Sequence, residues 1–165
     1  MRQLTTTWVD PQEISAALLK LPGIEFMRAA QRGEIPAPPV ARLLQFDKII
    51  EVAEGRVVFE YRPHESQYNP MGTVHGGASS GVLDAAMGCA VITTLKQGEA
   101  FTTLDLQLRY FRPITEKTGP LQCSGVILQR GKNYATAEAR LTGDSGRLYI
   151  HATSTCAVLT LPQKV

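Results

Sequence analysis

The chain has 165 residues, of which 44% are hydrophobic and 19% are charged, and its formal net charge is +2 at pH 7. This length is typical of one domain with a sizeable core, and the composition excludes a disordered or fibrous protein. The charge is too weak, and Lys and Arg are too dispersed, to indicate nucleic-acid binding.

The N-terminal residues and the cysteines bear on the compartment. Residues 1–10 are polar and contain no hydrophobic signal region, and no apolar run reaches the roughly 18 residues of a membrane span. Cys89, Cys123 and Cys156 are odd in number, widely spaced and without a CxxC motif, as expected of reduced core thiols. We therefore expect a cytoplasmic protein that does not enter a membrane.

Two short helices are predicted near the N-terminus. Asp10-Pro11-Gln12-Glu13 has the residue types of a helix N-cap, N1 and N3, and apolar residues then recur at helical spacing until Pro22-Gly23. A second helix is expected from Ile24 to Arg32, and a stiff proline-rich connector follows it. We interpret residues 1–40 as a helical extension and residues 41–165 as the main domain.

The main domain is predicted to contain six strands and one long helix. Val57, Phe59 and Tyr61 alternate with polar residues, which is typical of a half-buried strand. The segment from Gly76 to about Leu95 is almost wholly apolar or small, with Asp84 as its only charge, so this helix is expected to be enclosed. The strands are expected at 48–52, 56–62, 101–111, 121–130, 134–141 and 148–159. Two strands, a helix and four strands predict an α+β fold, in which an antiparallel sheet of about six strands wraps around the central helix.

Chemically informative residues gather where the long helix begins. The segment Asn69-Pro70-Met71-Gly72-Thr73-Val74-His75-Gly76-Gly77 leads into this helix. A helix N-terminus presents free backbone N–H groups that stabilise negative charge. Asp84, seven residues after the second glycine, is costly among apolar neighbours unless the protein uses it. Together these features indicate a site that polarises a carbonyl group and attacks it.

Ideal helix geometry separates the two features. At about 100° per residue, Gly77 and Asp84 lie on nearly the same face but about 10 Å apart along the axis. A rotation of about 900° separates His75 from Asp84, so their side chains face opposite ways. One copy of the chain does not easily bring both groups to a single carbonyl carbon, whereas two copies related by a two-fold axis can. The spacing therefore predicts a composite site in a homodimer.

These motifs resemble those of the hotdog-fold acyl-CoA thioesterases of the PaaI-like (phenylacetic acid degradation thioesterase-like) family. The matching residues are Asn69, Gly72, His75-Gly76-Gly77, Asp84, Thr102-Thr103-Leu104-Asp105 and Tyr110-Phe111-Arg112-Pro113. The resemblance covers roughly residues 43–160 and includes the order of the strands. It implies a hotdog fold, hydrolysis of acyl-CoA to the free acid and coenzyme A, and a homodimer or homotetramer. It implies no metal or redox cofactor, and the three histidines show no metal-ligand spacing.

The resemblance also implies roles for individual residues. The Gly77 N–H would stabilise the oxyanion, and Asp84 would be the nucleophile or the general base that activates water. Asn69 would hold the water or the thioester, Thr103 would position the water, and His75 would bind the loop or the region of the thioester sulfur. Each role has a structural alternative: a carboxylate that caps a buried donor, a turn residue, an ordinary strand residue and an orienting histidine.

Other residues are candidates for binding the substrate. Arg109, Arg112 and Lys132 could contact the phosphates of coenzyme A through charge-assisted hydrogen bonds, although exposed strand and turn charges are the ordinary alternative. Gly76 is assigned to substrate binding with them. Tyr110-Phe111 is interpreted as part of the core.

Three further functions compete with this hypothesis. Gly77-Ala78-Ser79-Ser80-Gly81 satisfies the serine-hydrolase pattern G-x-S-x-G, but the loop before it and the lack of βαβ alternation argue against a nucleophile elbow. A hotdog dehydratase or isomerase is a second alternative. A non-catalytic acyl-CoA-binding or sensor protein is a third, because fold does not fix function. Residues 10–33 could imitate a helix-turn-helix, but they lack a cationic recognition face.

Overall fold

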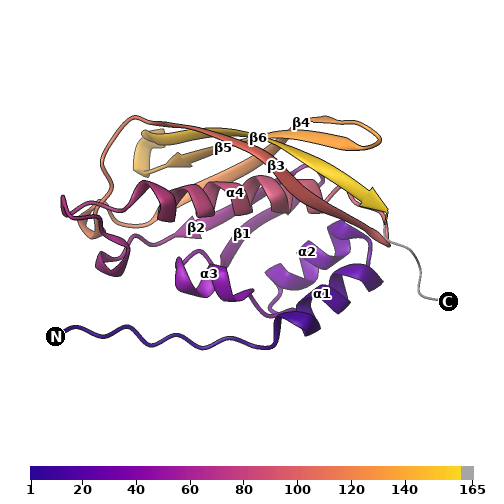
Figure 1. Ribbon diagram of the computed structural model, residues 1–165, viewed down its shortest axis with the longest axis horizontal. Helices are drawn as coiled ribbons and strands as arrows, with labels where there is room; N and C mark the ends of the chain where they lie inside the picture. The colour runs from indigo at the N-terminus through magenta and orange to yellow at the C-terminus, as the bar shows by residue number, and fades with distance from the viewer. Residues whose placement is uncertain (161–165) are drawn as a thin grey trace.

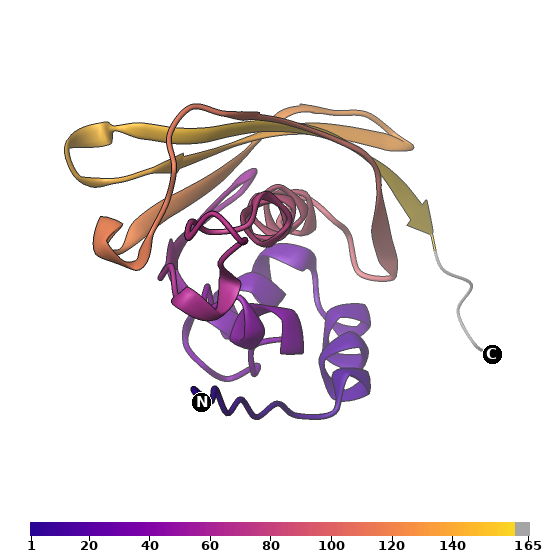
Figure 2. The ribbon, with the colours of Figure 1, turned by 60° about the vertical axis from the view of Figure 1, so that its left-hand side comes forward.

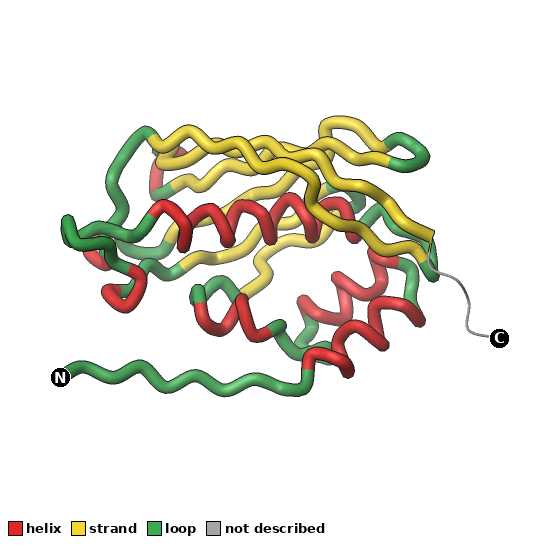
Figure 3. The backbone as a smooth tube through the Cα atoms, viewed as in Figure 1, coloured by secondary structure: helices red, strands yellow, loops and turns green. Residues whose placement is uncertain are grey.

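A six-stranded antiparallel sheet curves around one long helix, α4 (Gly76–Ile92), in the computed structural model of the protein (Figure 1). The structure describes residues 1–160. In Figure 2 the helix is seen nearly end-on beneath the arch of the sheet. Three shorter N-terminal helices lie on the side of α4 that faces away from the sheet (Figure 3). The predicted α+β architecture, with a wrapped central helix and an N-terminal helical extension, is confirmed.

The predicted elements are found with small shifts at their ends. The shorter helices are α1 (Pro11–Lys20), α2 (Gly23–Gln31) and α3 (Pro39–Leu43). The strands are β1 (Lys48–Ala53), β2 (Arg56–Tyr61), β3 (Glu99–Tyr110), β4 (Leu121–Arg130), β5 (Tyr134–Thr142) and β6 (Leu148–Thr160), arranged in the order β1-β2-β4-β5-β6-β3. The helix α3 was not predicted, because its prolines suggested a connector. Pro39 instead occupies the first position of the helix. The backbone N–H that a proline lacks would have no partner within the helix at this position.

Contact between α4 and the sheet depends on a glycine in β4. A Cβ atom at Gly125 would lie 2.1 Å from the carbonyl oxygen of Ala86, so a residue with a side chain cannot occupy this position without moving the helix. The close approach encloses the apolar side chains of α4, and Val82, Leu83 and Met87 are fully buried. A helix with apolar residues all round is stable in this position because the sheet covers one side and the extension the other.

The extension is docked on α4 and on β1. The N–H of Gly23 donates to the Leu95 carbonyl at 2.9 Å, and a Cβ atom at Gly23 would lie 1.7 Å from the Ile92 oxygen. On the other side, Gln31 Nε2 donates to the Ile50 carbonyl at 3.0 Å. The helix α2 also contributes apolar side chains to the same core as α4. The domain boundary after residue 40 stays a prediction.

Two further expectations concern the cysteines and the length of the helices. Cys123 and Cys156 are buried, Cys89 is partly buried, and all three are free thiols, as expected. Within residues 1–160, no helix combines the length and the hydrophobicity that crossing a membrane requires.

We expect Gly125→Ala to lower the free energy of unfolding by about 3 kcal/mol, because the added methyl group must displace the α4 backbone at Ala86. Denaturant unfolding measures this loss. The neighbouring Ser124 is partly exposed on the other face of β4, so Ser124→Ala is the control and should change stability by no more than about 0.5 kcal/mol. Equal effects of the two substitutions would contradict the close approach.

Candidate active site

Asp84 and Thr103 meet where α4 crosses β3. The Thr103 hydroxyl donates to Asp84 Oδ1 at 3.0 Å, and both residues are partly exposed. The pairing of β3 with β6 is interrupted by a bulge between Thr103 and Asp105, which leaves Leu104 without a partner in the register. Bulges re-aim side chains and are common beside active sites. The structure thus brings together the two residues that were assigned to activating water.

Two thiols lie close to the Asp84 carboxylate. Burial, and then the negative charge of Asp84, raise the pKa of the Cys89 thiol to about 12. Burial also raises the pKa of Cys156, which lies opposite Thr103 in β6, and the charge of Asp84 acts in the same direction. Both thiols therefore stay protonated at neutral pH. A protonated thiol is a poor nucleophile, so Asp84 does not compete with a cysteine here.

His75 forms the N-cap of α4. Its Nδ1 atom accepts a hydrogen bond from the Gly77 N–H at 2.9 Å. An accepting Nδ1 carries no proton, so in the neutral imidazole the proton is on Nε2, which becomes a donor. The N–H that was expected to bind the oxyanion is therefore occupied by His75 in the free chain. A thioester oxygen can accept from it only when the exposed imidazole turns aside.

Asn69 shapes the loop in front of the helix. Its Oδ1 atom accepts from the backbone N–H groups of Met71 and Thr73 at 2.9 and 3.3 Å, and its Nδ2 donates to the Thr73 hydroxyl at 3.0 Å. These are the contacts of an Asx-type turn, and they commit both ends of the side chain to the loop. Asn69 also lines a depression of about 400 Å³ beside Gly76 and Arg112.

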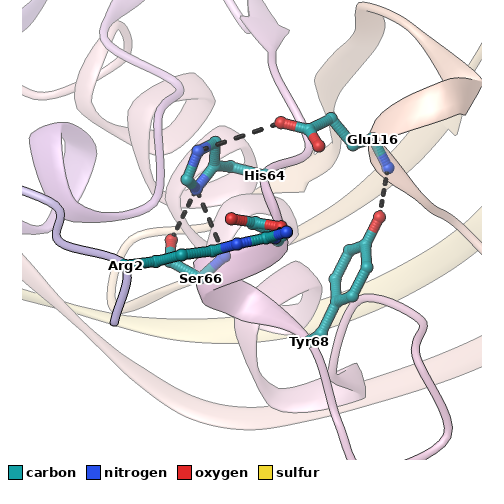
Figure 4. Close-up of polar contacts among 6 residues, drawn as sticks. Arg2, His64, Ser66, Tyr68 and Glu116 are labelled. Atoms are coloured by element: carbon teal, nitrogen blue, oxygen red, sulfur yellow. Dashed lines mark hydrogen bonds and ion pairs between the residues drawn. The ribbon is translucent and has the colours of Figure 1, made fainter.

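Surface contacts fasten the loop that leads to His75. The Tyr68 hydroxyl accepts from the backbone N–H of Glu116 at 2.7 Å (Figure 4). Arg2 forms an ion pair with Glu65. The first contact ties the loop to the segment between β3 and β4, and the second ties it to the N-terminal residues. Both contacts are exposed or partly exposed, so we assign them a positioning effect rather than a large contribution to stability.

Tyr110 links the end of β3 to the start of α4. Its hydroxyl donates to the Gly76 carbonyl at 2.9 Å. Tyr110 is 52% exposed and Phe111 is 53% exposed, so the prediction that they belong to the core is wrong. An aromatic residue in a strand has the same sequence pattern on an edge strand as on a central one, and β3 is an edge. The sequence therefore gave no signal for the Tyr110 contact.

The cationic candidates do not gather in one copy of the chain. Arg109 lies opposite His151 of β6, and Arg112 lies at the same end of the sheet. The turn that carries Lys132 lies beside Val158, near the other end of β6. Seven residues of extended strand separate the two positions, which corresponds to about 23 Å. One copy therefore cannot use all three cations on one phosphate group.

The serine-hydrolase alternative fails on geometry. Ser79 is 2% exposed, and its hydroxyl donates back to the carbonyls of His75 and Gly76 at 3.4 and 3.2 Å. It lies within the first turn of α4, with no strand running directly into it. His151 is 2.9 Å from the Glu138 carboxylate on β5 and belongs to a different part of the sheet. Ser79 is a packed helix residue.

Among residues 1–160, no group of three or more His, Cys, Asp or Glu side chains has an arrangement that could hold a metal ion. The expectation that the chemistry needs no cofactor stays a prediction.

Comparison with known proteins places these features in a family. The model of the thioesterase superfamily matches residues 71–150. Acyl-coenzyme A thioesterase 13 of Mus musculus is 26% identical over 117 residues, which are 70% of this chain and 81% of the mouse protein. The phenylacetic acid degradation-related protein of Ralstonia eutropha JMP134 has a solved structure that is 32% identical, with a TM-score of 0.72 over 79% of this chain and 97% of that protein. A Streptococcus mutans protein solved with bound acetyl-CoA has the same fold at 21% identity, with a TM-score of 0.63 over 70% and 90% of the two chains.

The wrapped helix and these matches define a hotdog-fold protein, as the sequence motifs predicted. The chain belongs to the thioesterase superfamily. It is a thioester hydrolase.

We expect His75→Ala to lower the free energy of unfolding by about 1 kcal/mol, because it removes the N-cap of α4. Asparagine is a good N-cap, so His75→Asn should keep this stability while it removes the Nε2 donor. Thermal unfolding measures the first effect, and kcat for thioester hydrolysis measures the second. Full activity of His75→Asn would show that His75 acts only by capping, and an unchanged stability of His75→Ala would contradict the cap.

Proposed function

We propose that the protein hydrolyses acyl-CoA thioesters to the free acid and coenzyme A, at a site that two copies of the chain build together. The observation that carries this proposal is the hydrogen bond from Thr103 to Asp84, on the same helix whose first turn contains the Gly77 N–H. The name of the mouse relative supports acyl-CoA as the substrate class.

The chemistry follows from one carboxylate and one amide. Thr103 donates to Oδ1 of Asp84, and Oδ2 has no hydrogen-bond partner among residues 1–160, so it can accept from a water. Acting as a general base, Asp84 takes a proton from this water while the water oxygen bonds to the thioester carbon. The Gly77 N–H, once the His75 imidazole has turned aside, stabilises the resulting oxyanion. The carbon–sulfur bond then breaks, and the coenzyme A thiolate takes the proton. The alternative, direct attack by Asp84 followed by hydrolysis of the anhydride, uses the same groups.

The free edge of β3 supports assembly into a dimer. This strand is twelve residues long, and its neighbour on one side is β6, whereas its other side is the edge of the sheet. Leu104, near the middle of β3, is 56% exposed. A long uncovered edge strand with exposed apolar residues readily pairs with another chain. The other edge, β1, has six residues, a bulge near Ile49, and a hydrogen bond from Gln31 to its Ile50 carbonyl.

Antiparallel pairing of two β3 strands would place the catalytic groups together. A two-fold axis at the middle of β3 passes near Leu104. Thr103 is the next residue toward the N-terminal end of the strand, so it lies close to the axis. Asp84, which is hydrogen-bonded to Thr103, therefore also lies close to the axis and to the partner. Because Tyr110 holds the start of α4 at the far end of β3, the second copy presents its own helix start to this Asp84. The same pairing brings the Arg109 end of one copy toward the Lys132 end of the other.

Replacing the carboxylate tests the hydrolysis. We expect Asp84→Asn to lower kcat by about 10³-fold, because an amide cannot take the proton from water. Thr103→Ala should lower kcat by about tenfold or more, since it removes a hydrogen bond to a charged group. Free-thiol release from acyl-CoA measures both effects. Asp144→Asn, which changes an exposed carboxylate in the turn between β5 and β6, is the control and should leave kcat at the wild-type value. Tight binding of acyl-CoA without turnover by the wild type would instead support the sensor alternative.

Mixing two inactive variants tests the composite site. Gly77→Pro removes the proposed oxyanion donor at a position of the first helical turn that tolerates proline. A heterodimer of Gly77→Pro with Asp84→Asn contains one site with both groups intact. If subunits exchange at random, half of the dimers are mixed, and we expect about a quarter of wild-type activity to return. No recovery, with subunit exchange shown by mass spectrometry, would contradict a site shared between copies.

A further inference from the structure

An apolar cavity of about 370 Å³ lies between the N-terminal extension and α4. Its walls come from α2, the connector to α3, α3 itself, β1, β2 and one face of α4. Representative lining residues are Phe26, Met27, Ala30, Ile35, Phe59 and Ala85. The charged lining residues, Arg42 and Asp47, pair with each other at 3.3 Å. The cavity therefore suits an uncharged hydrocarbon group.

The helix α2 is a fixed wall of this cavity. The close fit of Gly23 against Ile92 and the hydrogen bond from Gln31 to β1 hold the two ends of α2. Phe26 is buried in the core, whereas Ala30, about one turn later, is only partly buried and borders the empty space. The small side chain of Ala30 thus helps to keep the cavity open.

The cavity reaches the part of α4 that lies next to Asp84. Ala85 and Cys89 line the cavity, and they stand about 100° and 140° from Asp84 around the helix. The strip of helix surface between Asp84 and these two residues, about 40–60° from Asp84, holds Gly81 and Gly88. The effect of Asp84 on the pKa of the Cys89 thiol, which adds to that of burial, places the carboxylate within electrostatic reach of the cavity. The Leu44 and Phe101 side chains lie over these two glycines, so they separate Asp84 from the cavity, and an acyl chain that enters the cavity passes beside them.

We propose that this cavity binds the acyl chain of the thioester, and that α2 makes the protein selective for unbranched medium-chain acyl groups. This proposal rests on the proposed hydrolysis of acyl-CoA at Asp84. A group of about the size of water takes up about 30 Å³, so the cavity holds about a dozen methylene-sized groups. A single aromatic ring would leave about half of this space unfilled. A hydroxyl or carboxylate substituent would lose its water without a free charged partner in return.

Chain length tests the proposal first. Each methylene group that enters the cavity should lower KM about fourfold. We expect KM to fall steadily from butanoyl-CoA through octanoyl-CoA to decanoyl-CoA, and phenylacetyl-CoA to have a higher KM than octanoyl-CoA. A KM that does not change with chain length, or a preference for phenylacetyl-CoA, would overturn the proposal.

Filling the cavity from its far wall tests the role of α2. We expect Ala30→Phe to lower the ratio of kcat/KM for octanoyl-CoA over acetyl-CoA at least tenfold. Ala16→Phe, which adds the same ring to an exposed position of α1 outside the cavity, should leave this ratio at the wild-type value. Thermal unfolding checks that both variants fold, and Ala30→Leu is the smaller replacement if Ala30→Phe does not. An unchanged ratio in a folded cavity variant would overturn the proposal.

Binding of S-decyl-CoA, a thioether that cannot be hydrolysed, separates this proposal from the proposed function. Calorimetry should give a Kd at least tenfold higher for Ala30→Phe than for the wild type and Ala16→Phe. Chain-dependent binding of the thioether, without turnover of any acyl-CoA, would support the cavity and overturn the hydrolysis. If acyl-CoA is hydrolysed but Ala30→Phe does not change the Kd of the thioether, the hydrolysis is supported and the proposed role of the cavity is overturned.

Discussion

The structure depends on the enclosure of α4, a helix that is apolar on every side. Gly125 permits the helix backbone to touch the sheet at Ala86, and Gly23 permits the N-terminal extension to touch the last residue of the same helix, Ile92. Each contact removes apolar surface from water, which is the main source of stability. Burying a helix this completely also fixes what it carries, so Asp84 and the His75 cap are held on a rigid element rather than on loops.

Most of the fold followed from the sequence because its patterns were strong. The alternation of Val57, Phe59 and Tyr61 and the apolar run after Gly76 identified the strands and the central helix. The helix α3 was missed because a proline at the first helical position and a proline in a connector look alike in sequence. The exposure of Tyr110 was missed for a related reason, since strand order decides which strand is an edge and no local pattern records it.

The candidate site was predictable in its chemistry and less so in its contacts. The spacing of Gly77 and Asp84 depends only on helix geometry, so the sequence alone places the two groups about 10 Å apart along the helix. The hydrogen bond from Thr103 to Asp84 requires β3 to pack on α4. The family resemblance predicted that these two residues act together, whereas the periodicity of the sequence did not. The turn contacts of Asn69 and the cavity beside α2 depend on side-chain packing, and local pattern carries no information about either.

The hydrogen bond from Gly77 to His75 has a consequence for selectivity against small ions. An uncapped helix start attracts small anions such as phosphate and sulfate. In this chain the imidazole already satisfies the donor, so a weakly bound ion gains little by displacing it. A ligand that also binds through its acyl chain or its phosphates can offset the cost of displacing the imidazole. The hydrogen bond therefore sets the same cost for every ligand of this N–H, and only a molecule with several other contacts readily offsets it.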